Sequence, residues 1–151
     1  MKVDNTSAST ESEIRALTNE CSAALREKNI EGLMKFYAGD IVLFDLAPPL
    51  AYAGADAYRK NLEDWFLTFD GSISYDITDQ TIVVDGDVAF VFSFNHLRGK
   101  RDDGEETDVW LRATIGLRRI GGQWLIVHEH ASVPFYMDGS DKAAVDLKPH
   151  D

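Results

Sequence analysis

The sequence has few basic side chains and a single cysteine, and both shortages narrow the range of functions. Only 15 of its 151 residues are Lys or Arg, against 26 Asp or Glu, so the formal net charge is -11. Nucleic acids and anionic membranes are bound by basic surfaces, so we expect neither as a partner. With Cys21 alone, an intramolecular disulfide is excluded and a cysteine-based zinc site is not expected.

Long apolar runs are also missing. The N-terminal stretch MKVDNTSAST has no hydrophobic segment of the kind found in signal peptides, and no run approaches the length of a transmembrane helix. These absences predict a cytoplasmic protein. A chain of 151 residues, 44% of them hydrophobic, is long enough for one domain with a sizeable core.

Helical spacing of apolar residues characterises the first half of the chain. A capping box of Thr10 and Glu13 predicts where the first helix begins. The pattern predicts helices over 10–28, 30–38 and 55–69, with a short strand over 41–46. One domain over 10–135 is therefore expected, with polar tails at 1–9 and 137–151.

The second half of the chain reads as strands. Asp85-Gly86 and Gly121-Gly122 are strong hairpin signals, and each is flanked by long segments rich in β-branched and aromatic residues. The predicted strands cover 72–84, 87–99, 106–120 and 123–133. Helices followed by a meander of strands predict an α+β fold, with helices packed on one face of an antiparallel sheet.

This order of elements resembles the SnoaL-like, ketosteroid-isomerase-like group of the nuclear transport factor 2-like superfamily. Two segments carry the resemblance, AALREKNIEGLMKFYAGDIVLFD and GGQWLIVHEHASVP. The first is similar to the helix pair and strand that deliver a pocket carboxylate in ketosteroid isomerases. The second is similar to the last strand of the association domain of calcium/calmodulin-dependent protein kinase II.

The resemblance implies a cone-like, curved antiparallel sheet wrapped around the N-terminal helices, the cystatin-like α+β roll. It further implies a cavity for a small-molecule ligand inside the cone, no cofactor, and a homodimer formed through the convex face of the sheet. The expected dimer face combines one apolar patch with His128 and His130 nearby. The patch consists of Leu111, Ala113, Ile115, Trp124 and Ile126.

The last strand contains His128, Glu129 and His130 in a row, and their orientation decides the site. Side chains alternate along a strand, so Glu129 faces one side and both histidines face the other. A two-residue turn at Gly121-Gly122 places Thr114 opposite Glu129, with Arg112 as the diagonal neighbour of Glu129. The resemblance selects the face of Glu129 as the cavity side. No third ligand accompanies the histidines, so no metal site is expected.

Asp45 matches the position of the general base in ketosteroid isomerases, where apolar surroundings strengthen a carboxylate as a base. The alternative is a strand-end aspartate that caps the turn before Pro48. Three roles are open for Arg112 and Glu129. The two could form a structural ion pair, they could activate water together with Asp45, or Arg112 could bind a carboxylate of the ligand. Cys21 and Thr114 stand where the isomerases carry a tyrosine and a second acid, so steroid isomerisation by their mechanism is not expected.

The expected catalytic residues are therefore Asp45, Arg112 and Glu129. The expected substrate-binding residues are Tyr58, Trp65, Phe92, Phe94, His96, Trp110 and Thr114. The functional hypothesis is acid/base chemistry without a cofactor on a small, largely apolar, ring-containing molecule. The alternative is a non-catalytic ligand-binding or assembly domain of the same fold.

Overall fold

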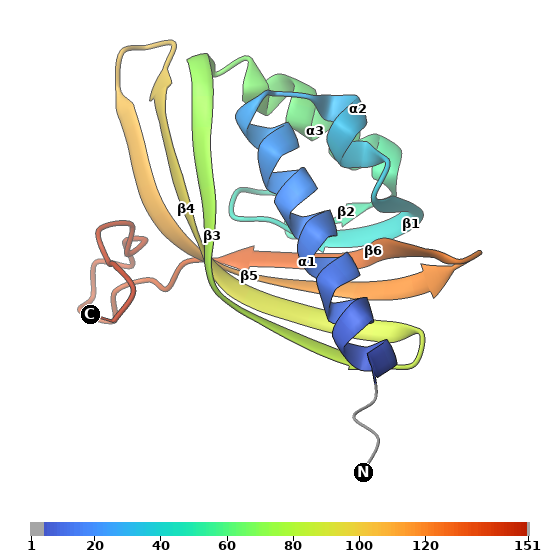
Figure 1. The fold of residues 1–151 in the computed structure, drawn as a ribbon. Helices are drawn as coiled ribbons and strands as arrows, with labels where there is room; N and C mark the ends of the chain where they lie inside the picture. The colour runs from blue at the N-terminus through green and yellow to red at the C-terminus, as the bar shows by residue number, and fades with distance from the viewer. Residues whose placement is uncertain (1–4, 151) are drawn as a thin grey trace.

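A computed structural model describes residues 5–150, and its helices gather on one side of a strongly curved sheet (Figure 1). The helices are α1 Asn5–Arg26, α2 Ile30–Met34 and α3 Ala55–Phe66. The strands are β1 Tyr37–Phe44, β2 Tyr52–Ala53, β3 Phe69–Asp85, β4 Val88–Arg101, β5 Glu106–Ile120 and β6 Gln123–Ser132. None of the helices of residues 5–150 is long and apolar enough to cross a membrane.

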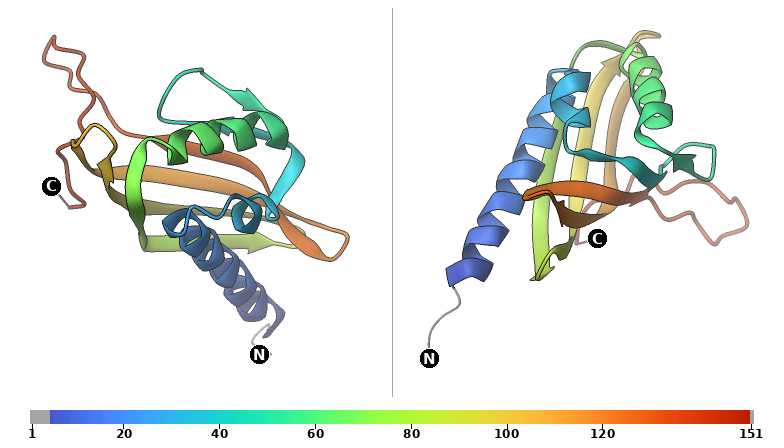
Figure 2. Two further views of the ribbon diagram at one scale, coloured as in Figure 1. Left: turned by 90° about the horizontal axis from the view of Figure 1, so that it is seen from above. Right: turned by 90° about the vertical axis from the view of Figure 1, so that its right-hand side faces the viewer.

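The six strands form one sheet in the order β2-β1-β6-β5-β4-β3. The long strands β3 to β6 make an antiparallel meander, as predicted from the two hairpin signals. β1 pairs with β6 in the parallel sense, so the sheet is mixed and not antiparallel throughout. The sheet curves around α1 and α3, which close its concave side (Figure 2). The α+β fold is thus the one that the sequence predicted.

Two boundaries in the first half differ from the prediction. The first helix begins at Asn5, so the described part of the predicted tail, residues 5–9, is helical; residues 1–4 lie outside the described residues. The second helix ends at Met34, and the residues predicted to continue it enter the sheet. The backbone explains this change, because the amide of Ile126 donates a hydrogen bond to the carbonyl of Phe36 at 2.8 Å. Tyr37 therefore belongs to β1.

The C-terminal segment is more ordered than a polar tail. Phe135 and Ala143 form an isolated antiparallel bridge. Ala144 is buried, with an exposed fraction of 2%. Its amide donates a hydrogen bond to the carbonyl of Pro134 at 2.8 Å, which holds the segment against the end of the sheet.

A β-bulge at Val127 changes which side chains face inward. Ile120 pairs with Gln123, as the predicted turn requires, but the register shifts by one residue beyond Ile126. Val127 is the extra residue on β6, so Glu129 pairs with Ile115 instead of with Thr114. If side chains alternated strictly along β6, Ile126 and Glu129 would point to opposite faces of the sheet. The bulge places both on the concave face.

The concave face of the sheet and the helices enclose the hydrophobic core. The residues expected to form an exposed dimer patch lie in this interior, so that expectation is wrong. Leu111, Ala113, Trp124 and Ile126 are buried with exposed fractions of 3–7%, and Ile115 is partly buried. On β4 the inward side chains include Val91, Asn95 and Leu97.

The convex side of the sheet carries an apolar surface, which we call the outer aromatic face. Its residues are Val42, Phe44, Val83, Phe90, Phe92, His128 and His130. Strand pairing sets Phe92 beside Thr114, Thr114 beside His130, and His130 beside Phe44. The ring of Phe44 contacts the rings of His128 and His130 at centroid distances of 4.8 and 5.4 Å. Both histidines thus face the convex side, as predicted.

Candidate functional site

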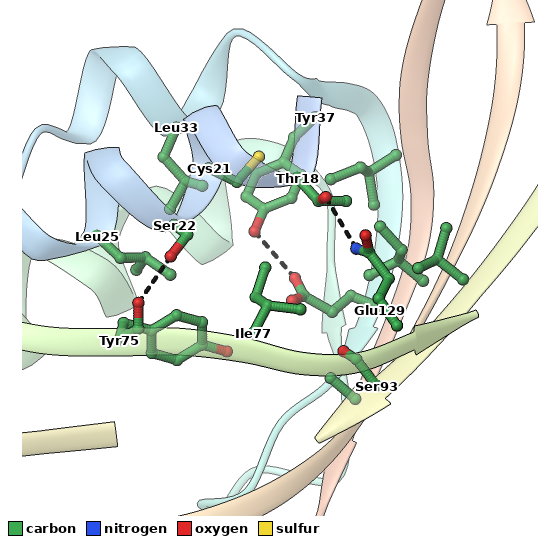
Figure 3. Close-up of a pocket in the computed structure, with 15 residues that line it drawn as sticks. Thr18, Cys21, Ser22, Leu25, Leu33, Tyr37, Tyr75, Ile77, Ser93 and Glu129 are labelled. Atoms are coloured by element: carbon green, nitrogen blue, oxygen red, sulfur yellow. Dashed lines mark hydrogen bonds between the residues drawn. The ribbon is translucent and has the colours of Figure 1, made fainter. Parts of the chain in front are cut away.

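A cavity with two adjoining chambers lies between the helices and the concave face of the sheet. The inner chamber, between α1 and the sheet, has a volume of about 50 Å³ (Figure 3). The outer chamber extends toward α3 and the end of β1 and has a volume of about 160 Å³. Leu25, Tyr37, Tyr75 and Glu129 line both chambers, so Glu129 lies where the two meet.

Glu129 is the carboxyl group at the centre of this cavity. The hydroxyl of Tyr37 donates a hydrogen bond to Glu129 Oε2 at 2.9 Å (Figure 3). The pKa of Glu129 is raised from its ordinary 4.5 to about 7. Burial is the largest cause, the Tyr37 hydrogen bond lowers the pKa, and the nearby carboxyl of Asp45 raises it. This carboxyl can therefore hold or release a proton near neutral pH.

Buried tyrosines surround Glu129. Burial raises the pKa of Tyr37, Tyr58 and Tyr75, with the charge of Glu129 as the next contribution, so the three hydroxyls stay protonated and can donate hydrogen bonds. The rings of Tyr37 and Tyr58 meet edge to face with centroids 5.6 Å apart. Asn95, only 5% exposed, donates from Nδ2 to the Tyr75 hydroxyl at 2.8 Å.

Asp45 follows β1 and lines the outer chamber. The amide of Leu46 donates to Asp45 Oδ1 at 2.7 Å, and Asn61 Nδ2 lies 3.4 Å from Asp45 Oδ2. The hydroxyl of Tyr52 in turn donates to Asn61 Oδ1 at 2.9 Å. Both interpretations of Asp45 therefore fit its position, because it binds the next backbone amide and also borders the cavity.

Of the expected site residues, Asp45, Tyr58, Trp65 and Glu129 line the cavity. Arg112 does not. Its side chain is exposed on the convex side, and its Nε donates to Ser132 Oγ at 3.2 Å. The expected Arg112–Glu129 pair is therefore wrong, because the bulge at Val127 shifts the register and the two side chains face opposite sides of the sheet.

Five expected substrate-binding residues also lie on the convex side, so their expected inward orientation is wrong. They are Phe92, Phe94, His96, Trp110 and Thr114. The ring of His96 stacks on Trp110 at 4.1 Å, and His96 Nε2 lies 2.6 Å from Asp108 Oδ1, away from Asp45. The family resemblance implies the opposite orientation for β4, and the strand pairing of the structure corrects it.

Several residues that line the cavity, or bond to its lining residues, could not be predicted from the sequence. Tyr37 lies in a segment predicted as helix, whereas in the structure it belongs to β1 and lines the cavity. Ser93 and Asn95 alternate with the phenylalanines of β4, and Ser93 Oγ donates to Asn95 Oδ1 at 2.7 Å. Two polar residues spaced by two in the apolar first part of β4 were the available signal of polar groups on its inner face.

The cavity offers no metal centre within residues 5–150, where no group of three or more His, Cys, Asp or Glu side chains is placed to hold an ion. No Lys, Arg or His among these residues lines either chamber. Proton transfer and hydrogen bonding are thus the chemistry that the lining side chains supply.

An α+β roll that encloses a carboxyl-containing cavity defines a recognisable class of domain. Residues 14–136 match the family model described as a SnoaL-like domain. The chain therefore belongs to the SnoaL-like family of the NTF2-like (nuclear transport factor 2-like) superfamily. No curated protein matches the chain in a sequence comparison.

Solved structures share the fold over nearly the whole chain. An NTF2-like protein of unknown function from Pseudomonas putida KT2440 is 37% identical, with a TM-score of 0.86 over 95% of this chain and 99% of that one. A ketosteroid isomerase-like protein from Erwinia carotovora atroseptica SCRI1043 is 22% identical, with a TM-score of 0.71 over 86% of this chain and 97% of that one. A cystatin-like fold protein of unknown function from Nostoc punctiforme PCC 73102 is 18% identical, with a TM-score of 0.69 over 89% and 96%.

Proposed function

We propose that the protein is a cofactor-independent enzyme that moves a proton on a small, ring-containing molecule bound in the cavity. The observation that carries this proposal is the carboxyl of Glu129, which faces the cavity and has a pKa of about 7. General acid–base catalysis is most efficient when the pKa of the catalytic group lies near the working pH. The reaction is of the isomerase, dehydratase, cyclase or hydrolase type.

The roles follow from the positions of the side chains. Glu129 takes up and returns the proton, and Tyr37 holds its carboxyl in place through the hydrogen bond to Oε2. The negative charge of Asp45 disfavours ionised Glu129 and so strengthens it as a base. Tyr58 and Trp65 provide flat apolar walls against which a ring packs. Arg112 has no part in this site.

Exchange of deuterium for hydrogen next to the carbonyl of small cyclic ketones, followed by NMR, tests the proposal. The parent protein is expected to accelerate exchange above the buffer rate, and Glu129→Gln is expected to abolish the acceleration. Ala131→Phe fills the outer chamber and should abolish it as well. Glu106→Gln alters an exposed glutamate of β5 and is the matched control.

Equal exchange in the parent protein and Glu129→Gln would remove Glu129 from the reaction. Exchange that survives Ala131→Phe would place the reaction outside the cavity. Near-UV circular dichroism of each variant shows whether its tertiary packing is intact.

A second function, assembly, is favoured by the outer aromatic face. Val42, Phe44, Phe90 and Phe92 expose 39–46% of their surface on one side of the sheet. A contiguous apolar patch of this kind usually marks an interaction site. We propose that two copies of the chain pair through this face to form a homodimer. In a protein without catalysis, the same surface and cavity would serve assembly and ligand binding.

A further inference from the structure

Among residues 5–150, the side chains that line the cavity include two carboxyl groups and no positively charged group. Asp45, which directly follows β1, and Glu129 of the neighbouring strand β6 supply these carboxyl groups. No Lys, Arg or His lines either chamber within residues 5–150. An anionic ligand would be buried against two carboxyl groups without a counter-charge, which is strongly unfavourable. The formal net charge of -11 opposes anions further.

Aromatic rings form much of the remaining wall. Tyr37, Tyr58, Trp65 and Tyr75 all line the outer chamber. Tyr37 and Tyr58 meet at 69°, so their ring faces point in different directions around the cavity. The faces of tyrosine and tryptophan rings attract ammonium groups within about 6 Å, and aromatic cages of this kind bind quaternary amines.

Two carboxylate oxygens next to these rings, one of Glu129 and one of Asp45, can accept a further hydrogen bond from a ligand. Glu129 Oε2 accepts from Tyr37, whereas no hydrogen-bond donor to Glu129 Oε1 is found among residues 5–150. Within the described part of the chain, Asp45 Oδ2 has only the long 3.4 Å contact with Asn61 Nδ2. A protonated amine carries up to three N–H donors and no acceptor, which complements two carboxyl groups.

The geometry points to a small, ring-bearing amine, bound as its ammonium ion with its nitrogen between Glu129 and Asp45 and its ring against the aromatic walls. The outer chamber, at about 160 Å³, is large enough, because a cavity of about 150 Å³ admits a benzene-sized ligand. This inference names the substrate class of the proposed function and therefore rests on it.

Binding of an ammonium ion is expected to be coupled to the ionisation of Glu129, because a neighbouring positive charge favours the carboxylate. The titratable groups that face Glu129 are Tyr37 from β1, Asp45 directly after β1, Tyr58 from α3, Tyr75 from β3 and Cys21 from α1. Burial raises the pKa of the tyrosines and of Cys21, so these groups stay neutral near pH 7. The ionisation that is coupled to ammonium binding is therefore that of Glu129.

Calorimetric titration with three benzyl compounds tests the inference. Benzylamine is the cationic probe, benzyl alcohol its neutral counterpart and benzoate the anion. We expect benzylamine to bind more tightly than benzyl alcohol, and benzoate not to bind. From about pH 6 to about pH 8 the affinity for benzylamine should rise about tenfold, because the ionised fraction of a carboxyl with a pKa of 7 rises by that factor.

Variants separate the cavity from the surface. Glu129→Gln should weaken benzylamine binding and abolish its pH dependence, and Asp45→Asn should weaken binding and shift the pH dependence to lower pH. Glu106→Gln, at an exposed position, should behave like the parent protein. Ala131→Phe should abolish binding because it fills the outer chamber.

Three outcomes would overturn the inference. If benzyl alcohol binds as tightly as benzylamine and Ala131→Phe abolishes both, the cavity takes neutral molecules, and the proposed function stands without the amine. If benzylamine binds Ala131→Phe as well as it binds the parent protein, the binding lies on the acidic surface. If none of the three compounds binds, the cavity is not a site for ring-containing ligands, and the proposed function fails together with the amine.

Discussion

The hydroxyl of Tyr37 donates a hydrogen bond of 2.9 Å to Glu129, and this bond opposes the other effects on that carboxyl. Burial and the charge of Asp45 raise the pKa of Glu129, and the tyrosine lowers it. The net value is about 7. Besides burial, the pKa of Glu129 thus depends on two side chains that act in opposite directions, Tyr37 of β1 and Asp45 directly after it. The two contributions can be separated by substitution.

Tyr37→Phe and Asp45→Asn should shift the pKa of Glu129 in opposite directions. Removing the tyrosine hydroxyl deprives the carboxylate of its hydrogen bond, so the pKa should rise above 7. Neutralising Asp45 removes a like charge, so the pKa should fall below 7. Titration of the carboxyl carbon by NMR with labelled glutamate measures both shifts.

Arg112→Met is the control for this titration. Arg112 lies on the convex side and bonds Ser132, so its loss should leave the pKa of Glu129 unchanged. A clear rise in the pKa after this substitution would mean that Arg112 is the partner of Glu129 after all.

Glu129→Gln should stabilise the protein at alkaline pH. The folded-state pKa of Glu129, about 7, lies above its ordinary value of 4.5, so the folded state binds more protons between these values. The contribution of Glu129 to the free energy of unfolding is therefore complete below about pH 4.5 and is lost as the pH rises through about 7. The glutamine has no charge to bury, so the variant should gain about 3 kcal/mol relative to the parent at about pH 8.

Urea unfolding of both proteins at about pH 5 and about pH 8 measures this difference, which should be small at the lower pH. The Arg112–Glu129 ion pair predicted from the sequence would give the opposite result. Glu129→Gln would then lower the stability, because Arg112 would be left without its counter-charge. A variant less stable than the parent at the higher pH would show that ionised Glu129 has a positive partner.

The fold could be predicted from the sequence because its signals are local. Capping residues, helical spacing and the turn at Gly121-Gly122 each depend on a few neighbouring residues, and they predicted the order of elements. The bulge at Val127 depends on how β6 fits between β5 and β1 in a curved sheet, and no local pattern reveals it. One extra residue was enough to reverse the expected neighbours of Glu129.

The site was only partly predictable for a second reason. Asp45 and Glu129 could be predicted as cavity residues because the family resemblance matches both to positions that line the cavity. The family resemblance implies that Phe92 points inward, but the interior side of β4 carries Ser93 and Asn95 instead. Aromatic side chains are usually buried. On β4 the inner face includes the polar side chains of Ser93 and Asn95, and the strand pairing of the structure shows which face is which.

Gly99 should not tolerate alanine. A Cβ at this position would lie 2.7 Å from the ring of Phe69, which is buried and contacts Trp65 edge to face at 5.1 Å. The ring would have to move, and Trp65 of the cavity wall with it, so we expect a loss of about 1–3 kcal/mol in the free energy of unfolding. Gly116→Ala, where the new Cβ would be 3.7 Å from His128, is the matched control and should cost much less.

The outer aromatic face should hold the homodimer together, and a single charge within it should separate the subunits. Phe92 is 45% exposed and pairs with Thr114 near the middle of this face. In a dimer, Phe92→Asp would bury a carboxylate without a partner, which is costly. Leu67→Asp adds the same charge at the end of α3, where Leu67 is 77% exposed, and should leave the dimer intact.

Light scattering at micromolar concentration should give twice the chain mass for the parent and Leu67→Asp, and the chain mass for Phe92→Asp. A parent protein of single-chain mass would leave the aromatic face without this role.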